Sequence, residues 1–108
     1  MFFLTNNVNS EEFSKLKISD NTVVLDVRTP AEYSQGKIEG AINISYPSSD
    51  FETKVKELSK EKKYLVYCRS GSRSTFACLV MKKLGYKNIM NLKGGLIDWS
   101  RNSKPLVR

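Results

Sequence analysis

The chain is 108 residues long and carries a formal net charge of +7, with 40% hydrophobic and 27% charged residues. This length predicts a single domain that buries one core, and the composition is ordinary for a soluble globular protein. No apolar run approaches the roughly 18 residues that span a bilayer. The opening residues 1–4 are apolar but lack the basic flank of a secretory signal. We therefore expect a cytoplasmic protein without membrane association.

The positive charge comes from 18 Lys and Arg against 11 Asp and Glu, which makes nucleic acid the first partner to consider. The lysines are scattered along the chain, however, and several alternate with glutamates on one helical stretch, which is typical of a solvated surface. We therefore expect no nucleic-acid partner. The positive field instead favours the approach of small anions.

The residue types that are missing narrow the chemistry further. The chain has no histidine, so it contains no Cys–His or Ser–His catalytic pair. Its two cysteines alone do not supply the four ligands of a structural zinc site. A structural disulfide between them is not expected in a reducing compartment. We expect neither a metal ion nor another cofactor, and a catalytic cysteine here has to be activated without imidazole.

In chain order, the hydrophobic periodicity and the turn residues predict helices alternating with strands. The predicted elements are a helix over 10–16, a strand over 22–27, a helical turn over 31–34, a strand over 41–44, a helix over 49–58, a strand over 64–67, a helix over 74–84, a strand over 88–92 and a helix over 96–101. Asn9 or Ser10 is expected to cap the first helix. The tail from Asn102 is expected to be ordered only where Leu106 and Val107 dock. The alternation predicts an α/β fold whose largely parallel sheet is covered by helices on both faces.

The most informative segment is the polar loop over residues 68–74, with the sequence Cys-Arg-Ser-Gly-Ser-Arg-Ser. It joins the predicted strand at 64–67 to the predicted helix at 74–84. Because the crevice of a parallel sheet lies outside the carboxyl ends of its strands, this loop is where α/β proteins place reactive groups. Backbone N–H groups at the start of a helix favour a thiolate over a thiol and attract anions. The loop therefore predicts that Cys68 is a nucleophile that acts on a small oxyanion.

The side chains of this loop have expected parts in that chemistry. Arg73 is expected to hold the oxygens of a dianion with its two-pronged guanidinium while its charge supports the thiolate, and Arg69 is expected to act at the rim. Gly71 permits backbone conformations that turn successive N–H groups inward. The competing interpretation of Cys68 as a small core residue is disfavoured, because its neighbours are polar or charged. The other loop residues predicted to contribute to substrate binding are Ser70, Ser72 and Ser74.

A second group of charged residues lies near the end of the first predicted strand. Asp26, Arg28 and Glu32 are expected to form an ion-paired scaffold under the cysteine loop, with Arg28–Glu32 as the pair. These residues are interpreted as structural support rather than as catalytic groups. Trp99 and the Gly94–Gly95 turn are interpreted as packing residues.

Four segments of the chain carry a shared pattern: residues 26–28 with 32–33, residues 36–44, residues 68–74, and residues 92–95 with Trp99. Together they resemble the rhodanese family of sulfurtransferases. Their order and spacing match the family from about residue 8 to residue 100. The resemblance implies a rhodanese-like three-layer sandwich with a central parallel five-stranded sheet, a domain core over about 8–101 and a tail over 102–108. The family usually has histidine where this chain has Lys37; since that histidine is not thought to do chemistry, the change concerns only local packing and charge.

The resemblance also implies a function, that of a thiosulfate sulfurtransferase. Cys68 is then expected to carry a sulfane sulfur as a persulfide, taken from thiosulfate or another small anionic sulfur donor and passed to cyanide or a thiol. A thioredoxin-like protein is a further acceptor to consider, and we expect a monomer. Cys78, in an apolar helical stretch, is interpreted as a core residue rather than as a resolving thiol that captures the persulfide.

Two other functions stay open. A persulfide carrier or regulatory module, loaded by a partner protein, needs the same cysteine loop, so the sequence does not separate it from an enzyme. A phosphatase or arsenate reductase on the same fold is disfavoured by loop length. Four residues separate Cys68 from Arg73, one fewer than in the protein tyrosine phosphatase pattern. A tighter ring of N–H groups suits a single sulfur atom better than a phosphoryl group.

Overall fold

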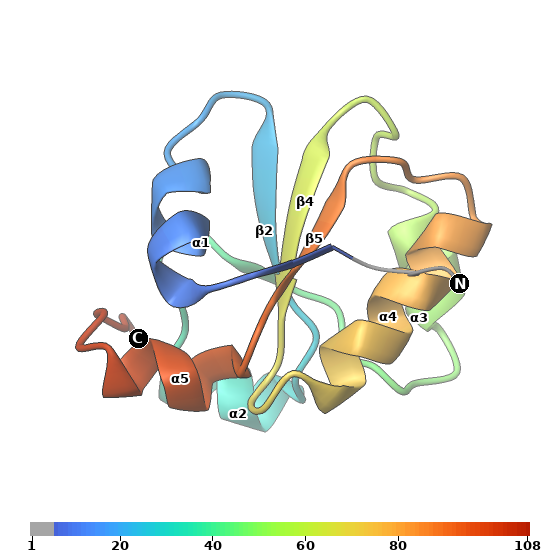
Figure 1. Cartoon of the computed structure of the whole chain (residues 1–108). Helices are drawn as coiled ribbons and strands as arrows, with labels where there is room; N and C mark the ends of the chain where they lie inside the picture. The colour runs from blue at the N-terminus through green and yellow to red at the C-terminus, as the bar shows by residue number, and fades with distance from the viewer. Residues whose placement is uncertain (1–5) are drawn as a thin grey trace.

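The computed structural model describes residues 6–108, and the opening residues 1–4 considered above lie outside them. Along these residues, strands alternate with helices around one sheet (Figure 1). No helix in this range combines the length and the apolar composition that crossing a membrane requires. In chain order the elements are β1 (Asn6–Val8), α1 (Ser10–Leu16), β2 (Thr22–Asp26), α2 (Pro30–Gln35), β3 (Ile42–Asn43), α3 (Phe51–Val55), β4 (Lys63–Tyr67), α4 (Ser72–Lys83), β5 (Ile89–Leu92) and α5 (Gly95–Arg101).

The sheet is parallel throughout, with the strands in the spatial order β1-β5-β4-β2-β3. β4 lies at the centre and pairs with β2 along its whole length, ending with Asp26 opposite Tyr67. Because the two strands end together, Cys68 after β4 and Arg28 after β2 emerge at the same edge of the sheet. This edge is the crevice in which α/β folds place their reactive groups.

Helices cover both faces of the sheet, as the strand–helix alternation predicts. α3 and α4 pack on one face, where Phe51 and Met81 are buried, and α1 and α5 pack on the other (Figure 1). On that second face the ring centroids of Phe13 and Trp99 lie 5.8 Å apart, edge to face. The ring of Tyr67 is 6.3 Å from that of Phe13. The residue that precedes Cys68 is therefore anchored in an aromatic cluster.

The structure confirms the predicted α/β fold and each predicted helix and strand, with differences at their ends. The helix expected over 49–58 is confined to Phe51–Val55 and continues as turns. α4 begins at Ser72, two residues earlier than expected. The sequence does not predict β1, because its Asn-Asn-Val segment carries no strand pattern. β1 forms at the sheet edge by pairing with β5.

The C-terminal tail is attached at more points than the sequence predicts. Val107 forms an antiparallel bridge with Lys37, which follows α2. The indole Nε1 of Trp99 donates to the Pro105 carbonyl oxygen at 2.9 Å. Lys104 Nζ lies 2.8 Å from Glu11 Oε1. The tail thus runs from the end of α5 back to the segment beside α2.

The aromatic cluster behind Cys68 should contribute strongly to stability. Trp99 is 1% exposed, so Trp99→Ala is expected to lower the free energy of unfolding by about 3–5 kcal/mol. Phe76 on α4 is 55% exposed, and Phe76→Ala should change it by less than about 0.5 kcal/mol. Urea denaturation of both variants measures the difference; similar losses in the two would contradict the assigned core.

Candidate active site

Cys68 lies directly after β4, in a loop whose backbone amides point at its sulfur. The amide nitrogen of Gly71 lies 3.0 Å from Cys68 Sγ, and the amide nitrogen of Ser74 lies 3.4 Å from it. The residue itself is 1% exposed. The sulfur is therefore held beneath the loop with two N–H donors directed at it, as the strand–loop–helix pattern predicts.

Gly71 gives the loop its tight turn. Its φ of +100° lies in the left-handed region, which residues with a side chain rarely adopt. A Cβ at this position would also come within 3.4 Å of the Gly94 amide nitrogen. The Gly71 carbonyl oxygen meanwhile accepts from the Thr75 hydroxyl at 2.7 Å. The Ser74 hydroxyl oxygen lies 3.2 Å from the same carbonyl oxygen, and its single proton can turn either to that oxygen or to the Cys68 sulfur. The turn is thus fixed by its conformation and by the first turn of α4.

Two opposing effects set the pKa of the Cys68 thiol. Burial is the largest single influence and raises the pKa. Hydrogen bonds from the Ser74 hydroxyl and from the amides of Ser74, Gly71 and Ser70 lower the pKa, and together they outweigh burial. The net pKa lies below the ordinary thiol value. Neutral hydrogen-bond donors of the loop therefore supply the main stabilisation of the thiolate, whereas the sequence analysis also relied on the charge of Arg73.

Arg73 forms a two-pronged ion pair with Glu32. Its Nη1 lies 2.8 Å from Oε1 and its Nη2 lies 3.0 Å from Oε2 of that carboxylate. Arg73 lowers the pKa of Glu32 to about 2, helped by hydrogen bonds from Thr29. Glu32 in turn raises the pKa of Arg73, as does the negative charge of Cys68. The pair ties α2 to α4 beside the thiolate, so in this structure the guanidinium prongs hold Glu32 rather than being free for an anion.

The expected Arg28–Glu32 pair is wrong. Arg28 binds Asp26 instead, with its Nη2 2.7 Å from Oδ2, and also donates to the Gly36 carbonyl oxygen at 2.6 Å. The chain turns sharply after β2, and the Arg28 amide itself donates to Asp26 Oδ1 at 2.8 Å. This turn brings Arg28 back onto a buried neighbour, which leaves Glu32 to Arg73. The three residues do form an ion-paired scaffold with the loop, but through two pairs instead of one.

The start of α5 supports the cysteine loop from behind. The amide of Leu96 donates to the Cys68 carbonyl oxygen and the amide of Ile97 to the Arg69 carbonyl oxygen, both at 3.0 Å. A Cβ on Gly95 would lie within 2.7 Å of the Cys68 carbonyl oxygen and closer still to that of Arg69. Gly95 therefore allows the helix to approach the loop backbone. The sequence analysis interpreted Gly95 as a packing residue only. The two consecutive glycines before a helix were the one sequence feature that could have indicated this close approach to the loop backbone.

Three of the remaining predicted loop residues lie on the surface, and one is buried. Arg69, Ser70 and Ser72 are exposed, whereas Ser74 is fully buried next to the sulfur.

The second cysteine, Cys78, is buried in α4. Burial raises the pKa of its thiol to about 12, and the charge of Cys68 adds to the effect. A thiol with this pKa stays protonated and unreactive at neutral pH, which supports its interpretation as a core residue.

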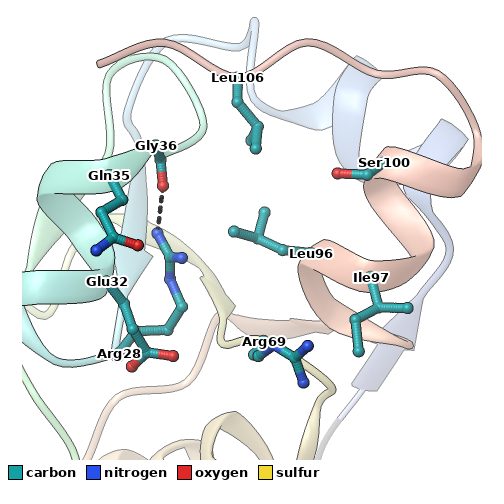
Figure 2. Close-up of a pocket in the computed structure, with 9 residues that line it drawn as sticks. All are labelled: Arg28, Glu32, Gln35, Gly36, Arg69, Leu96, Ile97, Ser100 and Leu106. Carbon is teal, nitrogen blue, oxygen red and sulfur yellow. Dashed lines mark hydrogen bonds between the residues drawn. The ribbon is translucent and has the colours of Figure 1, made fainter.

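A pocket of about 490 Å³ adjoins the cysteine loop (Figure 2). Arg69 brings the loop itself to the pocket wall, while Cys68 is not one of the lining residues. Figure 2 shows the apolar side chains of Leu96 and Leu106 facing the pocket from α5 and from the tail. The full lining is Arg28, Glu32, Gln35, Gly36, Arg69, Leu96, Ile97, Ser100 and Leu106.

Comparison with known proteins agrees with this architecture. Residues 9–102 match the family described as Rhodanese-like domain. A protein of Allochromatium vinosum named "Sulfurtransferase" is 36% identical over 105 residues, which cover 96% of each chain. A Schizosaccharomyces pombe protein named "Putative thiosulfate sulfurtransferase, mitochondrial" is 39% identical over 95 residues, covering 78% of this chain and 67% of the relative. The crystal structure of a rhodanese-related protein from Thermoplasma volcanium superimposes with a TM-score of 0.84 at 34% identity, covering 94% of this chain and 97% of that one. The chain belongs to the rhodanese-like family.

Removing the Ser74 hydroxyl should raise the pKa of Cys68. The hydroxyl stabilises the thiolate more than the neutral thiol, so Ser74→Ala is expected to shift the pKa upward. The rate of iodoacetamide alkylation against pH measures this shift. Ser72→Ala, which alters an exposed hydroxyl of the same loop, serves as the matched control; equal shifts in both variants would refute the assignment.

The Glu32–Arg73 pair predicts a dependence of stability on pH. The pKa of Glu32 is lowered from 4.5 to about 2 in the folded protein. The stabilisation is thus fully present above pH 4.5 and is lost as the pH falls toward 2. Wild type should therefore be more stable than Glu32→Gln at pH 6, by about 1 kcal/mol given the partial exposure of the pair, and the difference should vanish near pH 2. Thermal unfolding across this range measures it; a difference that persists at the lowest pH contradicts the ionic role.

Proposed function

We propose that this protein is a thiosulfate sulfurtransferase in which Cys68 carries the transferred sulfur as a persulfide. The observation that carries the proposal is the pair of amide donors, Gly71 and Ser74, directed at a cysteine sulfur whose pKa is lowered. The family and the relatives named as sulfurtransferases support the reaction class. The name of the fission-yeast relative supports thiosulfate as the donor.

In the first half-reaction, the Cys68 thiolate attacks the outer sulfur of thiosulfate. A new S–S bond forms at Cys68 as the S–S bond of thiosulfate breaks, and sulfite leaves with the electron pair. Sulfite is a stable anion, so its departure needs no general acid. This fits a chain that has no histidine.

In the second half-reaction, a nucleophile such as cyanide or a thiolate attacks the outer sulfur of the persulfide. The S–S bond at Cys68 breaks, and Cys68 leaves as the thiolate with which the cycle began, as in thiol–disulfide exchange. The loop amides stabilise the Cys68 thiolate with which the cycle begins and ends, which is the logic of an oxyanion hole. The Arg73–Glu32 pair keeps a guanidinium beside the reacting anions.

The mass of the intact protein after brief exposure to thiosulfate tests the proposal. Wild type is expected to gain one sulfur atom, to lose it on addition of a reductant, and to produce thiocyanate when cyanide is present. Cys68→Ser should neither gain sulfur nor produce thiocyanate, because a hydroxyl of similar size is scarcely ionised at neutral pH. Cys78→Ala, which removes the other thiol, should still gain sulfur and produce thiocyanate.

Other outcomes would identify the competing functions. If thiosulfate loads no sulfur but a cysteine desulfurase does, the chain is a persulfide carrier rather than a thiosulfate sulfurtransferase. If an aryl phosphate is hydrolysed rapidly and no thiocyanate forms, the protein is a phosphatase. Sulfur found on Cys78 in the wild type would contradict the assignment of the nucleophile.

A further inference from the structure

The Gly71 carbonyl oxygen, at the start of α4, has three hydrogen-bond donors around it. The amide of Thr75 donates to this oxygen at 3.1 Å and the Thr75 hydroxyl at 2.7 Å, while the Ser74 hydroxyl oxygen lies 3.2 Å away. A carbonyl oxygen has two lone pairs, so two donors satisfy it. The two donors of Thr75 are the closer ones, which leaves the Ser74 hydroxyl as the surplus donor.

The second acceptor within reach of the Ser74 hydroxyl is the Cys68 sulfur. After burial, which raises the pKa of Cys68, the hydrogen bond from this hydroxyl is the largest influence on that pKa and lowers it. Because Ser74 is fully buried, its proton is expected to bond one of these two acceptors. A group that occupies the Gly71 oxygen therefore controls how strongly Ser74 stabilises the thiolate.

The Thr75 hydroxyl is itself held in a fixed orientation. A threonine in a helix often bonds the carbonyl oxygen four residues earlier, but the Thr75 oxygen also accepts from Asn91 Nδ2 at 3.3 Å. With its lone pair engaged in this way, the single proton of the hydroxyl is directed to Gly71. The other N–H of the Asn91 side chain donates to Asn7 Oδ1 of β1 at 3.0 Å. The amide group of Asn91 is thus fixed between β1 and α4.

Asn91 is a polar residue in an apolar layer. It is 2% exposed, lies in β5 opposite Val66 of β4, and is two residues from Ile89, and both of these residues belong to the core beneath α4. Its Oδ1 has no hydrogen-bond partner among residues 6–108. Burying an amide costs free energy that an apolar side chain in this position would not cost. The polar side chain therefore indicates a role beyond packing.

We propose that Thr75 is a positioning residue for the reaction of Cys68: held by Asn91, its hydroxyl occupies the Gly71 carbonyl oxygen and so directs the Ser74 proton to the sulfur. The inference rests on the proposed function for the reaction that is served, and it assigns parts to two residues outside the cysteine loop. Neither residue contacts the substrate. They act through the orientation of hydrogen bonds, and no covalent bond is made or broken in the process.

Removing the Thr75 hydroxyl tests the inference. Thr75→Val keeps the shape of the side chain but no longer satisfies the Gly71 oxygen, so the Ser74 proton should turn to that oxygen and the pKa of Cys68 should rise. Thr75→Ser, which keeps the hydroxyl, should retain the wild-type pKa. The rate of iodoacetamide alkylation of the full chain against pH measures both. An unchanged pKa in Thr75→Val would overturn the inference.

A double variant tests whether the effect passes through Ser74. In Ser74→Ala the proton in question is absent, so adding Thr75→Val should produce no further shift, and the double variant should have the same thiol pKa as Ser74→Ala alone. An equal upward shift from Thr75→Val in both backgrounds would overturn the inference, because Thr75 would then act on the loop without Ser74.

Two further substitutions separate positioning from packing. Asn91→Leu removes the donor to Thr75 and should raise the pKa of Cys68 by less than Thr75→Val does, with no effect when Thr75→Val is already present. An unchanged pKa in Asn91→Leu would overturn the part assigned to Asn91. Val80→Ala weakens the packing of α4 against the same core but touches none of these hydrogen bonds. It should leave the pKa as in the wild type; a shift as large as that of Thr75→Val would refute positioning in favour of packing.

None of these substitutions changes a charge, so the ionisable groups around the loop stay the same throughout. These groups are Arg69 and Arg73, Glu32 of α2, the Asp26–Arg28 pair after β2, and the thiol of Cys78.

The thiol pKa is measured without substrate, which separates the inference from the proposed function. If thiosulfate loads sulfur on Cys68 but the expected order of pKa values is absent, the inference alone is overturned. If that order is found but no sulfur is loaded, the proposed function fails while the positioning of the thiolate stands. If both hold, the pH profile of kcat/KM for thiosulfate should move upward in Thr75→Val by as much as the thiol pKa does.

Discussion

Burial and hydrogen bonding act on Cys68 in opposite directions, and the balance between them governs the site. A thiol enclosed among apolar groups stays protonated, as the raised pKa of Cys78 on the next helix shows. At Cys68 the amides of Gly71 and Ser74 point at the sulfur and shift the balance toward the thiolate. The two cysteines of the chain thus have opposite character because of hydrogen-bond donors, not because of exposure.

Those amides can act only if the loop keeps its shape, and two attachments hold it. On one side, Arg73 and Glu32 link the first turn of α4 to α2 through a two-pronged ion pair. On the other side, α5 packs against the loop backbone at Gly95 and binds its carbonyl oxygens. Both attachments use elements that flank the carboxyl end of the central strand. The sheet therefore positions the nucleophile, and the helices around it preserve the orientation of the amides.

Much of this arrangement could be predicted from local sequence patterns. The strand–loop–helix segment around Cys68 has a clear change of periodicity, and its placement at the sheet edge follows from the parallel topology. The partner of Arg28 could not be predicted, because the choice between Asp26 and Glu32 depends on how the chain turns after β2. The contact of Gly95 with the loop likewise depends on how closely α5 approaches, which no single segment encodes.

The tail that pairs with Lys37 also forms part of the pocket wall through Leu106. In consequence, the nucleophile and one boundary of its neighbouring cavity come from segments far apart in the chain. Substitutions in the last few positions can remodel that boundary without disturbing the sulfur-binding loop. Relatives that keep the cysteine loop can thus differ in the shape of this pocket, because the tail supplies a wall of the pocket but no donor to the sulfur.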